Sequence, residues 1–362
     1  MPDLNGLIQA MKFDHEWLSD GFVAESQRLA ANENTRHQHY VPQMYLKRWA
    51  IEGLLQQVEV DSTRELPPQP TKEVAKGKNF YTLPSIDSTL HLPLKWVETH
   101  LGRIESICAE HIETLVKWGS GVVSDATLKR DLSVYLGLQL TRTVASRERT
   151  LVLVHGPDAA KRIIWRRLNP SGNAAQLEEA MGKRFADPKQ EALDLMVKDV
   201  RNVAAEALFQ REWAVYRTVS PVPTSDDPVV VLSGPPLTRD VHAGVGYSAV
   251  MLFPLDPHHL LVMLKPGLSH RGPYKLKSSE ADQVVLEIVG AANLMAIERP
   301  GDGVIAQVSV PPRPVQEEMD GDRAGELSTE AAIRLLQDMV PRSRWAGAED
   351  QPAWAVQRWY SN

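Results

Sequence analysis

Apolar residues recur with helical spacing through much of the first part of the chain. The pattern is clearest over residues 94–118, where Val97, Leu101, Ile104 and Cys108 would share one side of a helix. Such a stripe indicates a helix that packs against a core with one face. The same spacing predicts helices, in chain order, over residues 6–30, 94–118, 125–149, 158–168, 174–186 and 189–210.

The pattern changes in the second part of the chain. Short runs rich in β-branched and apolar residues are separated there by Pro, Gly and Asp, which is typical of strands joined by turns. One further helix is predicted over residues 279–297. Strands are predicted over residues 54–60, 79–82, 213–219, 229–232, 247–253, 260–264 and 304–310, with a surface loop over residues 62–78. Helices first and strands later predict an α+β fold: a mainly helical N-terminal half followed by a small, largely antiparallel sheet with a packed helix.

These elements divide the chain into three expected regions. They are a helical lead-in over residues 1–35, a single α+β domain over residues 36–310 (helical part about 94–210, strand-rich part about 211–310), and an acidic linker, short helix and tryptophan-containing tail over residues 311–362. The short helix is predicted over residues 328–339. Trp345, Trp354 and Trp359 predict that the tail docks onto the body.

Composition narrows the class of protein. The 362 residues are 43% hydrophobic and 24% charged, with a net charge of −6, which is ordinary for a globular protein. Cys108 is the single cysteine, so an internal disulfide and a cysteine-rich metal site are excluded. No apolar run approaches the roughly 18 residues of a membrane span, and the acidic start lacks the features of a signal peptide. We therefore expect a cytoplasmic protein without a membrane partner.

The densest group of chemically active side chains lies between His37 and Trp49. Pro42 favours an extended backbone before it, so His37 and His39 would project from the same face of a strand. Two such imidazoles could bind a divalent metal ion, with Asp226 or Glu105 as a third ligand. The alternatives are that His39 acts alone as a general acid or base, or that it is a core histidine bonded to a backbone carbonyl.

Several short motifs, taken together, are similar to those of one known family. They are His39-Tyr40-Val41-Pro42-Gln43 with Tyr45-Leu46, Asn79-Phe80-Tyr81, Ile104-Glu105, Gln139-x-x-Arg142, Thr224-Ser225-Asp226-Asp227-Pro228-Val229, Phe253-Pro254-Leu255 and Asn293. In this order they resemble the bacterial domain of unknown function 4238 family over roughly residues 36–300. The chain departs from that pattern at Met44, Trp49 and Asp227. The resemblance implies an architecture and a set of site residues, but no established activity.

Two predicted helices carry the polar groups of that set. Tyr135, Gln139 and Arg142 fall on one helix face, and a buried arginine needs a carboxylate, a phosphate or carbonyl groups as partner. Glu98 and Glu105 share a face of the other helix. A half-buried Glu105 could serve as a general acid or base, or it could simply pair with Arg142.

The Asp-Asp-Pro element is the last member of the set. Asp227 precedes Pro228 and should be extended, so the carboxylates of Asp226 and Asp227 point apart and only one can face a site. The family pattern nominates Asp226. An ordinary loop turn is the alternative for this element.

These residues lead to three hypotheses. The first is a phosphodiester hydrolase, such as a nuclease of bacterial conflict or defence, with catalytic His39, Glu105, Arg142 and Asp226 and substrate-binding Tyr40, Gln43, Gln139 and Asn293. Residues 142–167 hold seven basic and two acidic side chains, which favours a nucleic acid or phosphate-bearing partner, although a solvated basic face would look the same. The second is a non-catalytic ligand- or partner-binding module built on a structural polar network. The third is an enzyme that acts on a nucleotide or another small anion.

Overall fold

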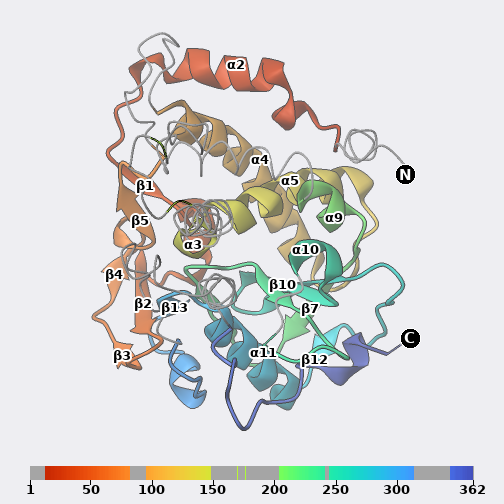
Figure 1. The fold of residues 1–362 in the computed structure, drawn as a ribbon. Helices are drawn as coiled ribbons and strands as arrows, with labels where there is room; N and C mark the ends of the chain where they lie inside the picture. The colour runs from red at the N-terminus through yellow and green to blue at the C-terminus, as the bar shows by residue number, and fades with distance from the viewer. Residues whose placement is uncertain are drawn as a thin grey trace.

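The computed structural model of the chain describes residues 13–81, 95–147, 204–240, 244–313 and 343–361, together with the single residues 169 and 176. Within these ranges the protein is a mixed α+β structure, as the sequence predicts (Figure 1). The helices predicted over residues 158–168, 174–186 and 328–339, most of the helix over residues 189–210, most of the basic segment and the acidic linker lie outside the described residues.

The elements are bounded as follows. The helices are η1 Glu16–Leu18, α2 Asp20–Leu29, η2 Ala30–Asn32, α3 Gln43–Leu46, η3 Lys47–Trp49, η4 Thr71–Glu73, α4 Trp96–Trp118, α5 Ala126–Arg142, α9 Ala205–Phe209, α10 Gly244–Tyr247, α11 Ser278–Ala291, η6 Ile305–Gln307 and η7 Gln357–Trp359. The strands are β1 His37–His39, β2 Leu54–Glu59, β3 Arg64–Glu65, β4 Gln69–Pro70, β5 Lys76–Lys78, β6 Gly121–Val122, β7 Glu212–Thr218, β8 Thr224–Ser225, β9 Val230–Leu232, β10 Val250–Asp256, β11 His259–Leu264, β12 Lys275–Leu276 and β13 Met295–Glu298.

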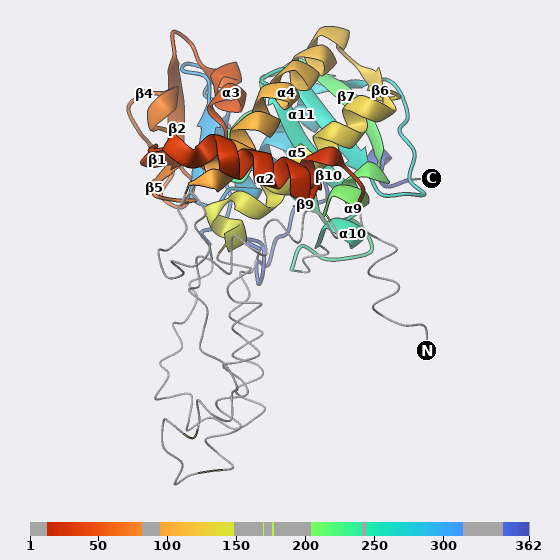
Figure 2. The ribbon, with the colours of Figure 1, turned by 90° about the horizontal axis from the view of Figure 1, so that it is seen from above.

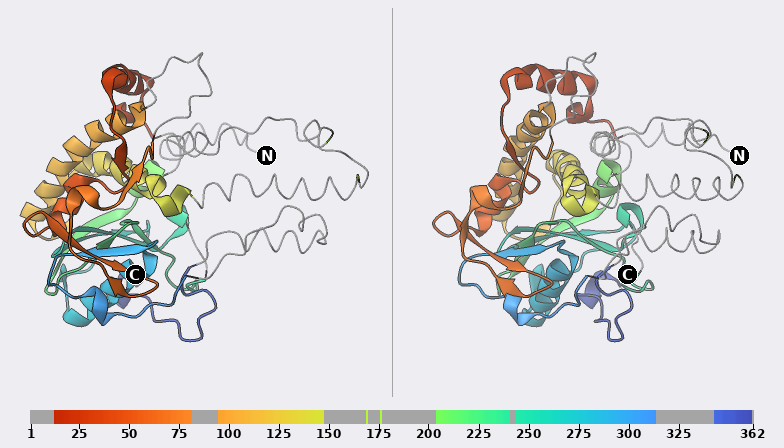
Figure 3. Two further views of the ribbon diagram at one scale, coloured as in Figure 1. Left: turned by 90° about the vertical axis from the view of Figure 1, so that its left-hand side faces the viewer. Right: turned by 60° about the vertical axis from the view of Figure 1, so that its left-hand side comes forward.

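The largest sheet forms the centre of the molecule. Its strands run in the order β12-β7-β11-β10-β9, with β6 also paired to β7, and of these pairings only β12–β7 is parallel. Along β10, Met251 and Phe253 pack in the core shared with α4 and α5, whereas Val250 and Leu252 pack in the core shared with α11. Because helices cover both faces, these strands are apolar at successive positions rather than alternating with polar residues (Figure 3).

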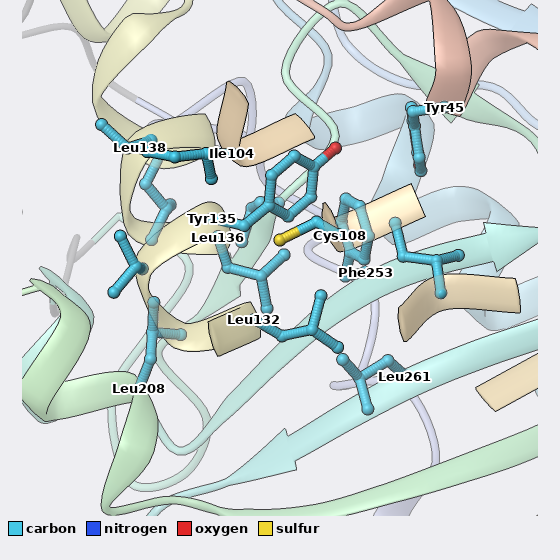
Figure 4. Packing of buried hydrophobic residues seen from close by; sticks show 14 of the residues in the cluster. Tyr45, Ile104, Cys108, Leu132, Tyr135, Leu136, Leu138, Leu208, Phe253 and Leu261 are labelled. Carbon is cyan, nitrogen blue, oxygen red and sulfur yellow. The ribbon is translucent and has the colours of Figure 1, made fainter. Parts of the chain in front are cut away.

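The helical side of this core is aromatic and tightly packed. Tyr135 of α5 lies beside Cys108 of α4 and over Phe253 of β10, with the Tyr135 and Phe253 ring centroids 6.2 Å apart (Figure 4). Tyr45 stacks on the other side of Phe253 at 4.8 Å. The residue range 37–49 is therefore a strand followed by a buried helix, as predicted. Tyr45, Leu46 and Trp49 are fully buried.

The helix predicted over residues 125–149 is interrupted. Asp125 caps α5 by accepting a hydrogen bond from the Leu128 backbone N–H, but α5 ends at Arg142. Thr143 is extended, and its hydroxyl accepts a hydrogen bond from the Ser146 backbone N–H. This side chain satisfies the first backbone donors of a new turn, so the chain changes direction immediately after Arg142.

Four other predicted elements are wrong, and the first is the surface loop over residues 62–78, which contains β3, β4, η4 and β5. The helix over residues 279–297 ends at Ala291, and β13 follows it, paired with β2 and β8. The strand over residues 79–82 is a turn where described, and the strand lies just before it as β5, which pairs with β1. The strand over residues 304–310 is replaced by η6 and extended chain, because the Glu298 carboxylate accepts hydrogen bonds from the Val304 and Ile305 backbone N–H groups.

The termini of the described chain cover two sides of this body. At one side α2 lies across α4 (Figure 2). At the other side Trp345 and Trp359 are buried in the tail and Trp354 packs against the core, so the expected docking of the tail is seen. No helix in the described ranges is long and apolar enough to cross a membrane.

Gly234 shows how closely this tail packs. Its φ is +73°, and an added Cβ would lie 2.5 Å from the Ala249 Cβ and 2.7 Å from Cε1 of Tyr360. We expect Gly234→Ala to destabilise the fold by about 2–4 kcal/mol, from backbone strain together with overpacking. Urea unfolding followed by tryptophan fluorescence would measure this loss. Gly246→Ala is the matched control, because nothing lies within 4 Å of its Cβ position; equal stability of the two variants would contradict the packing described.

Candidate functional site

An arginine held by two side chains lies where α4 and α5 meet. Arg142 Nη1 donates to Glu105 Oε1 at 2.6 Å, and Arg142 Nε donates to Gln139 Oε1 at 2.9 Å. Gln139 in turn donates from Nε2 to the Tyr40 carbonyl at 3.1 Å. Glu105, Gln139 and Arg142 are thus brought together as the helix spacing predicted, and the network ties both helices to the end of β1.

Arg142 retains one unused donor. The residue is 2% exposed, and its Nη2 is buried without a hydrogen-bond partner. Burial is the largest single influence and opposes the charge, but the charge and hydrogen bond of Glu105, together with Tyr81 and Tyr135, hold the pKa of Arg142 above its ordinary value. The Tyr135 hydroxyl, two turns earlier on the same face of α5, is also buried and has no hydrogen-bond partner. Unmet donors of this kind are uncommon in native interiors, and the described residues contain others, among them Nε of Arg48 and Nε of Arg344.

Glu98, which the sequence places on one helix face with Glu105 but to which it assigns no role, is a further titratable group of this site. It lies two turns before Glu105 on α4, on the same face and half-buried. Burial and the nearby charge of Glu105 raise the pKa of Glu98 to about 7. The signal available in the sequence was the seven-residue spacing of the two glutamates. The spacing does not reveal the burial that shifts this carboxyl into the range useful for proton transfer at neutral pH.

His39 lies at the edge of this cluster. Its Nε2 faces Gln43 Nε2 at 3.3 Å, and its ring also makes a backbone hydrogen bond at Lys72. Burial lowers the pKa of His39 below its ordinary value of 6.5, while the charges of Glu105 and Arg142 act on it in opposite directions. The imidazole is therefore neutral at pH 7. This geometry matches the core-histidine alternative more closely than a free catalytic base.

Asp226 is engaged by the backbone rather than by Arg142. Its Oδ1 accepts from the Asn293 N–H at 2.8 Å, and its Oδ2 accepts from the Leu294 and Met295 N–H groups at 2.8 and 3.2 Å. Burial raises the pKa of Asp226 to about 6, against the effect of these bonds, so the group remains ionised at pH 7. The Asn293 side chain accepts a hydrogen bond from Arg313. Asp226 and Asn293 thus hold the turn between α11 and β13.

Tyr40 connects the two neighbourhoods. Burial, with a contribution from the charge of Asp226, raises the pKa of the Tyr40 hydroxyl, and its ring packs against Phe80 at 5.4 Å between centroids. A second cation not anticipated by the sequence lies here: the Arg147 guanidinium is 3.8 Å from the centroid of the Phe80 ring. Burial lowers the pKa of Arg147. Of the described residues, no carboxylate forms an ion pair with it.

The metal alternative is not supported by the geometry. His37 is exposed on β1, whereas Gln38 points inward and its Oε1 accepts the Tyr81 N–H at 2.6 Å. Within the described ranges, no group of three His, Cys, Asp or Glu side chains is placed to hold a metal ion. His37, His39 and Asp226 are therefore not assembled as ligands.

A family model with the description "Protein of unknown function (DUF4238)" matches residues 37–302. The match begins with β1 and extends past β13, so it includes Glu98, Glu105, Gln139 and Arg142 as well as the backbone-binding Asp226. Neither the curated proteins nor the solved structures include one that matches this chain.

Proposed function

Since the chain belongs to the DUF4238 family of proteins of unknown function, we propose its activity from its own geometry: it is a phosphodiester hydrolase, a nuclease in which Glu98 and Glu105 transfer protons and Arg142 binds the phosphate. In the cell such an enzyme would degrade foreign nucleic acid in conflict or defence. The observation that carries the proposal is the buried Arg142, fixed by Glu105 and Gln139 and left with one unused donor.

The choice of a phosphodiester follows from the donor set. A guanidinium presents its N–H groups in a planar fork that matches the oxygens of a phosphate. Arg142 has its Nε and Nη1 occupied, so Nη2 is the atom left for such an oxygen, and Arg147 supplies a second positive charge nearby. The charge of Arg142 is already paired with Glu105, so the charge that favours an anionic substrate is that of Arg147, with which no described carboxylate forms an ion pair.

The two glutamates supply the acid and the base. Seven residues along a helix correspond to an axial rise of about 10 Å, which places the carboxyls of Glu98 and Glu105 on opposite sides of a group bound between them. Glu105 takes a proton from water as the water oxygen attacks phosphorus. Glu98 gives its proton to the leaving oxygen as the P–O bond breaks. One proton is accepted and one is donated, so the step balances.

A second candidate function has specific support. The polar side-chain atoms of Gln139, His39 and Asp226 form hydrogen bonds with neighbouring protein groups. A network satisfied in this way rigidifies a core, and it suits a non-catalytic module that presents a ligand- or partner-binding surface. In that case no substrate would turn over.

The pKa of Glu98 yields a test of the enzyme. As an acid, Glu98 must be protonated, so cleavage of RNA or DNA should fall as the pH rises through about 7. Glu98→Gln cannot give up a proton, and we expect its kcat to drop about 100-fold and to lose this alkaline decline. Assays on both nucleic acids, with magnesium and with a chelator, measure these rates.

The matched control is Glu110→Gln, an exposed glutamate on the same helix, which should cleave at the wild-type rate. Wild-type protein inactive on both nucleic acids, or a Glu98→Gln protein as active as wild type, would exclude the acid–base proposal. The first of these outcomes would favour the binding module.

A further inference from the structure

A pocket lies beside Tyr247, the last residue of α10. It has a volume of about 430 Å³ and lies between the segment after β9 and the start and end of the β10–β11 hairpin. Ser233, Ala249 and Leu268 line it, together with Pro235 and Pro236. The volume is within the range of sites for small organic ligands.

Two exposed side chains give this pocket a chemical character. Tyr247, at the end of α10, is 77% exposed and lines the pocket. Lys265 follows directly after β11, and its Nζ lies 6.0 Å from the centroid of the Tyr247 ring. Of the described lining residues, Lys265 alone carries a charge. A flat aromatic surface beside an ammonium group is suited to a planar ring that bears an anion.

A buried arginine beneath the pocket adds to its positive potential. Arg211 is 1% exposed, and its guanidinium donates to the carbonyls of Val245, Ser248 and Met263. These bonds fix both the segment that carries Tyr247 and the strand that leads to Lys265. Burial lowers the pKa of Arg211 to about 10, which leaves it charged at pH 7. No described carboxylate pairs with it, so its field is not neutralised locally.

We propose that this pocket binds a nucleoside monophosphate, with the base stacked on Tyr247 and the phosphate paired with Lys265. The exposed tyrosine ring accounts for the base, and the positive charges of Lys265 and Arg211, with which no described carboxylate forms an ion pair, account for the phosphate. This site is separate from Arg142 and does not rest on the hydrolase proposal.

Calorimetric titration of the full chain with AMP tests the site, with adenosine and inorganic phosphate as partial ligands. We expect saturable AMP binding that weakens at least about tenfold, or roughly 1.4 kcal/mol, in Tyr247→Ala and in Lys265→Gln. Adenosine should bind weakly and be insensitive to Lys265→Gln, because it carries no phosphate. Lys117→Gln, whose side chain is 75% exposed on α4, should bind AMP as the wild type does.

Two results would overturn the assignment. One is the absence of saturable AMP binding by the wild-type protein. The other is AMP binding that survives both Tyr247→Ala and Lys265→Gln but is lost in Arg142→Lys, which would place the nucleotide at the α4–α5 site instead. Because Tyr247 and Lys265 are exposed, both substitutions should leave the unfolding curve unchanged, and this curve confirms that any loss of binding is local.

Discussion

Asp226→Ala is expected to lower the free energy of unfolding by about 3–5 kcal/mol. The carboxylate is 4% exposed and accepts three backbone hydrogen bonds, from Asn293, Leu294 and Met295. Alanine would leave three N–H groups without a partner, and a buried unsatisfied donor costs about 1–3 kcal/mol. Partial entry of water would reduce the sum, which is why the expected loss is less than three full penalties.

The position of Asp226 in the sheet increases this effect. Its own N–H donates to the Met295 carbonyl at 3.0 Å, directly after β8 pairs with β13. Loss of the carboxylate would therefore loosen the junction at which α11 ends and β13 begins. Asp226→Asn retains the shape but turns an amide NH₂ toward backbone donors, so we expect it to lose most of the same stability.

Urea unfolding at pH 7.5, above the pKa of about 6 for Asp226, measures the ionised state. Asp282→Ala, an exposed aspartate on α11, is the control and should change stability by less than about 0.5 kcal/mol. Should Asp226→Ala unfold with the midpoint and slope of the wild type, the structural role assigned to Asp226 would be wrong. A large loss, by contrast, would explain a reduced activity of the variant without any catalytic role.

The same residue marks where prediction from sequence stops. Local periodicity located α4, the start of α5 and the buried segment over residues 37–49, because each depends on neighbours within a few turns. The end of α11 depends on a carboxylate that lies more than sixty residues earlier in the chain. The pattern of Val284, Val285 and Ile288 continues smoothly into the residues of β13, so nothing local indicates that the helix ends at Ala291.

The candidate site also has a part that the sequence predicts and a part that it does not. Helix spacing and the family motifs identified Glu105, Gln139 and Arg142, and the three side chains are in contact. The shifted pKa of Glu98 could not be anticipated, since it arises from packing and from the charge of Glu105 rather than from residue type. In the sequence Arg147 is only one cation of a basic segment, and its place over Phe80 depends on the turn that follows β5, more than sixty residues earlier in the chain.

Arg142→Lys is expected to reduce cleavage at least about 1,000-fold while retaining the positive charge. Lysine lacks the planar fork, so it cannot keep Glu105 and Gln139 in place and still offer a donor to the phosphate. Loss of a transition-state arginine in phosphoryl transfer costs about 10³–10⁵ in rate. Arg28→Lys, an exposed arginine on α2, is the matched control and should cleave normally.

Two measurements together distinguish a catalytic from a structural role of this pair. They are the cleavage rate and the urea unfolding of Arg142→Met, of Glu105→Gln and of the double variant. Either single change leaves a partner of the buried pair uncompensated and should cost about 3 kcal/mol, whereas the double variant should lose much less than the sum. A purely structural network would show this coupling in stability alone, with kcat of each folded variant near that of the wild type. If Arg142 binds the phosphate, Arg142→Lys must lose more kcat than its loss of stability explains. The reason is that the substrate then depends on Nη2, the donor that the protein leaves unpaired and that lysine does not have.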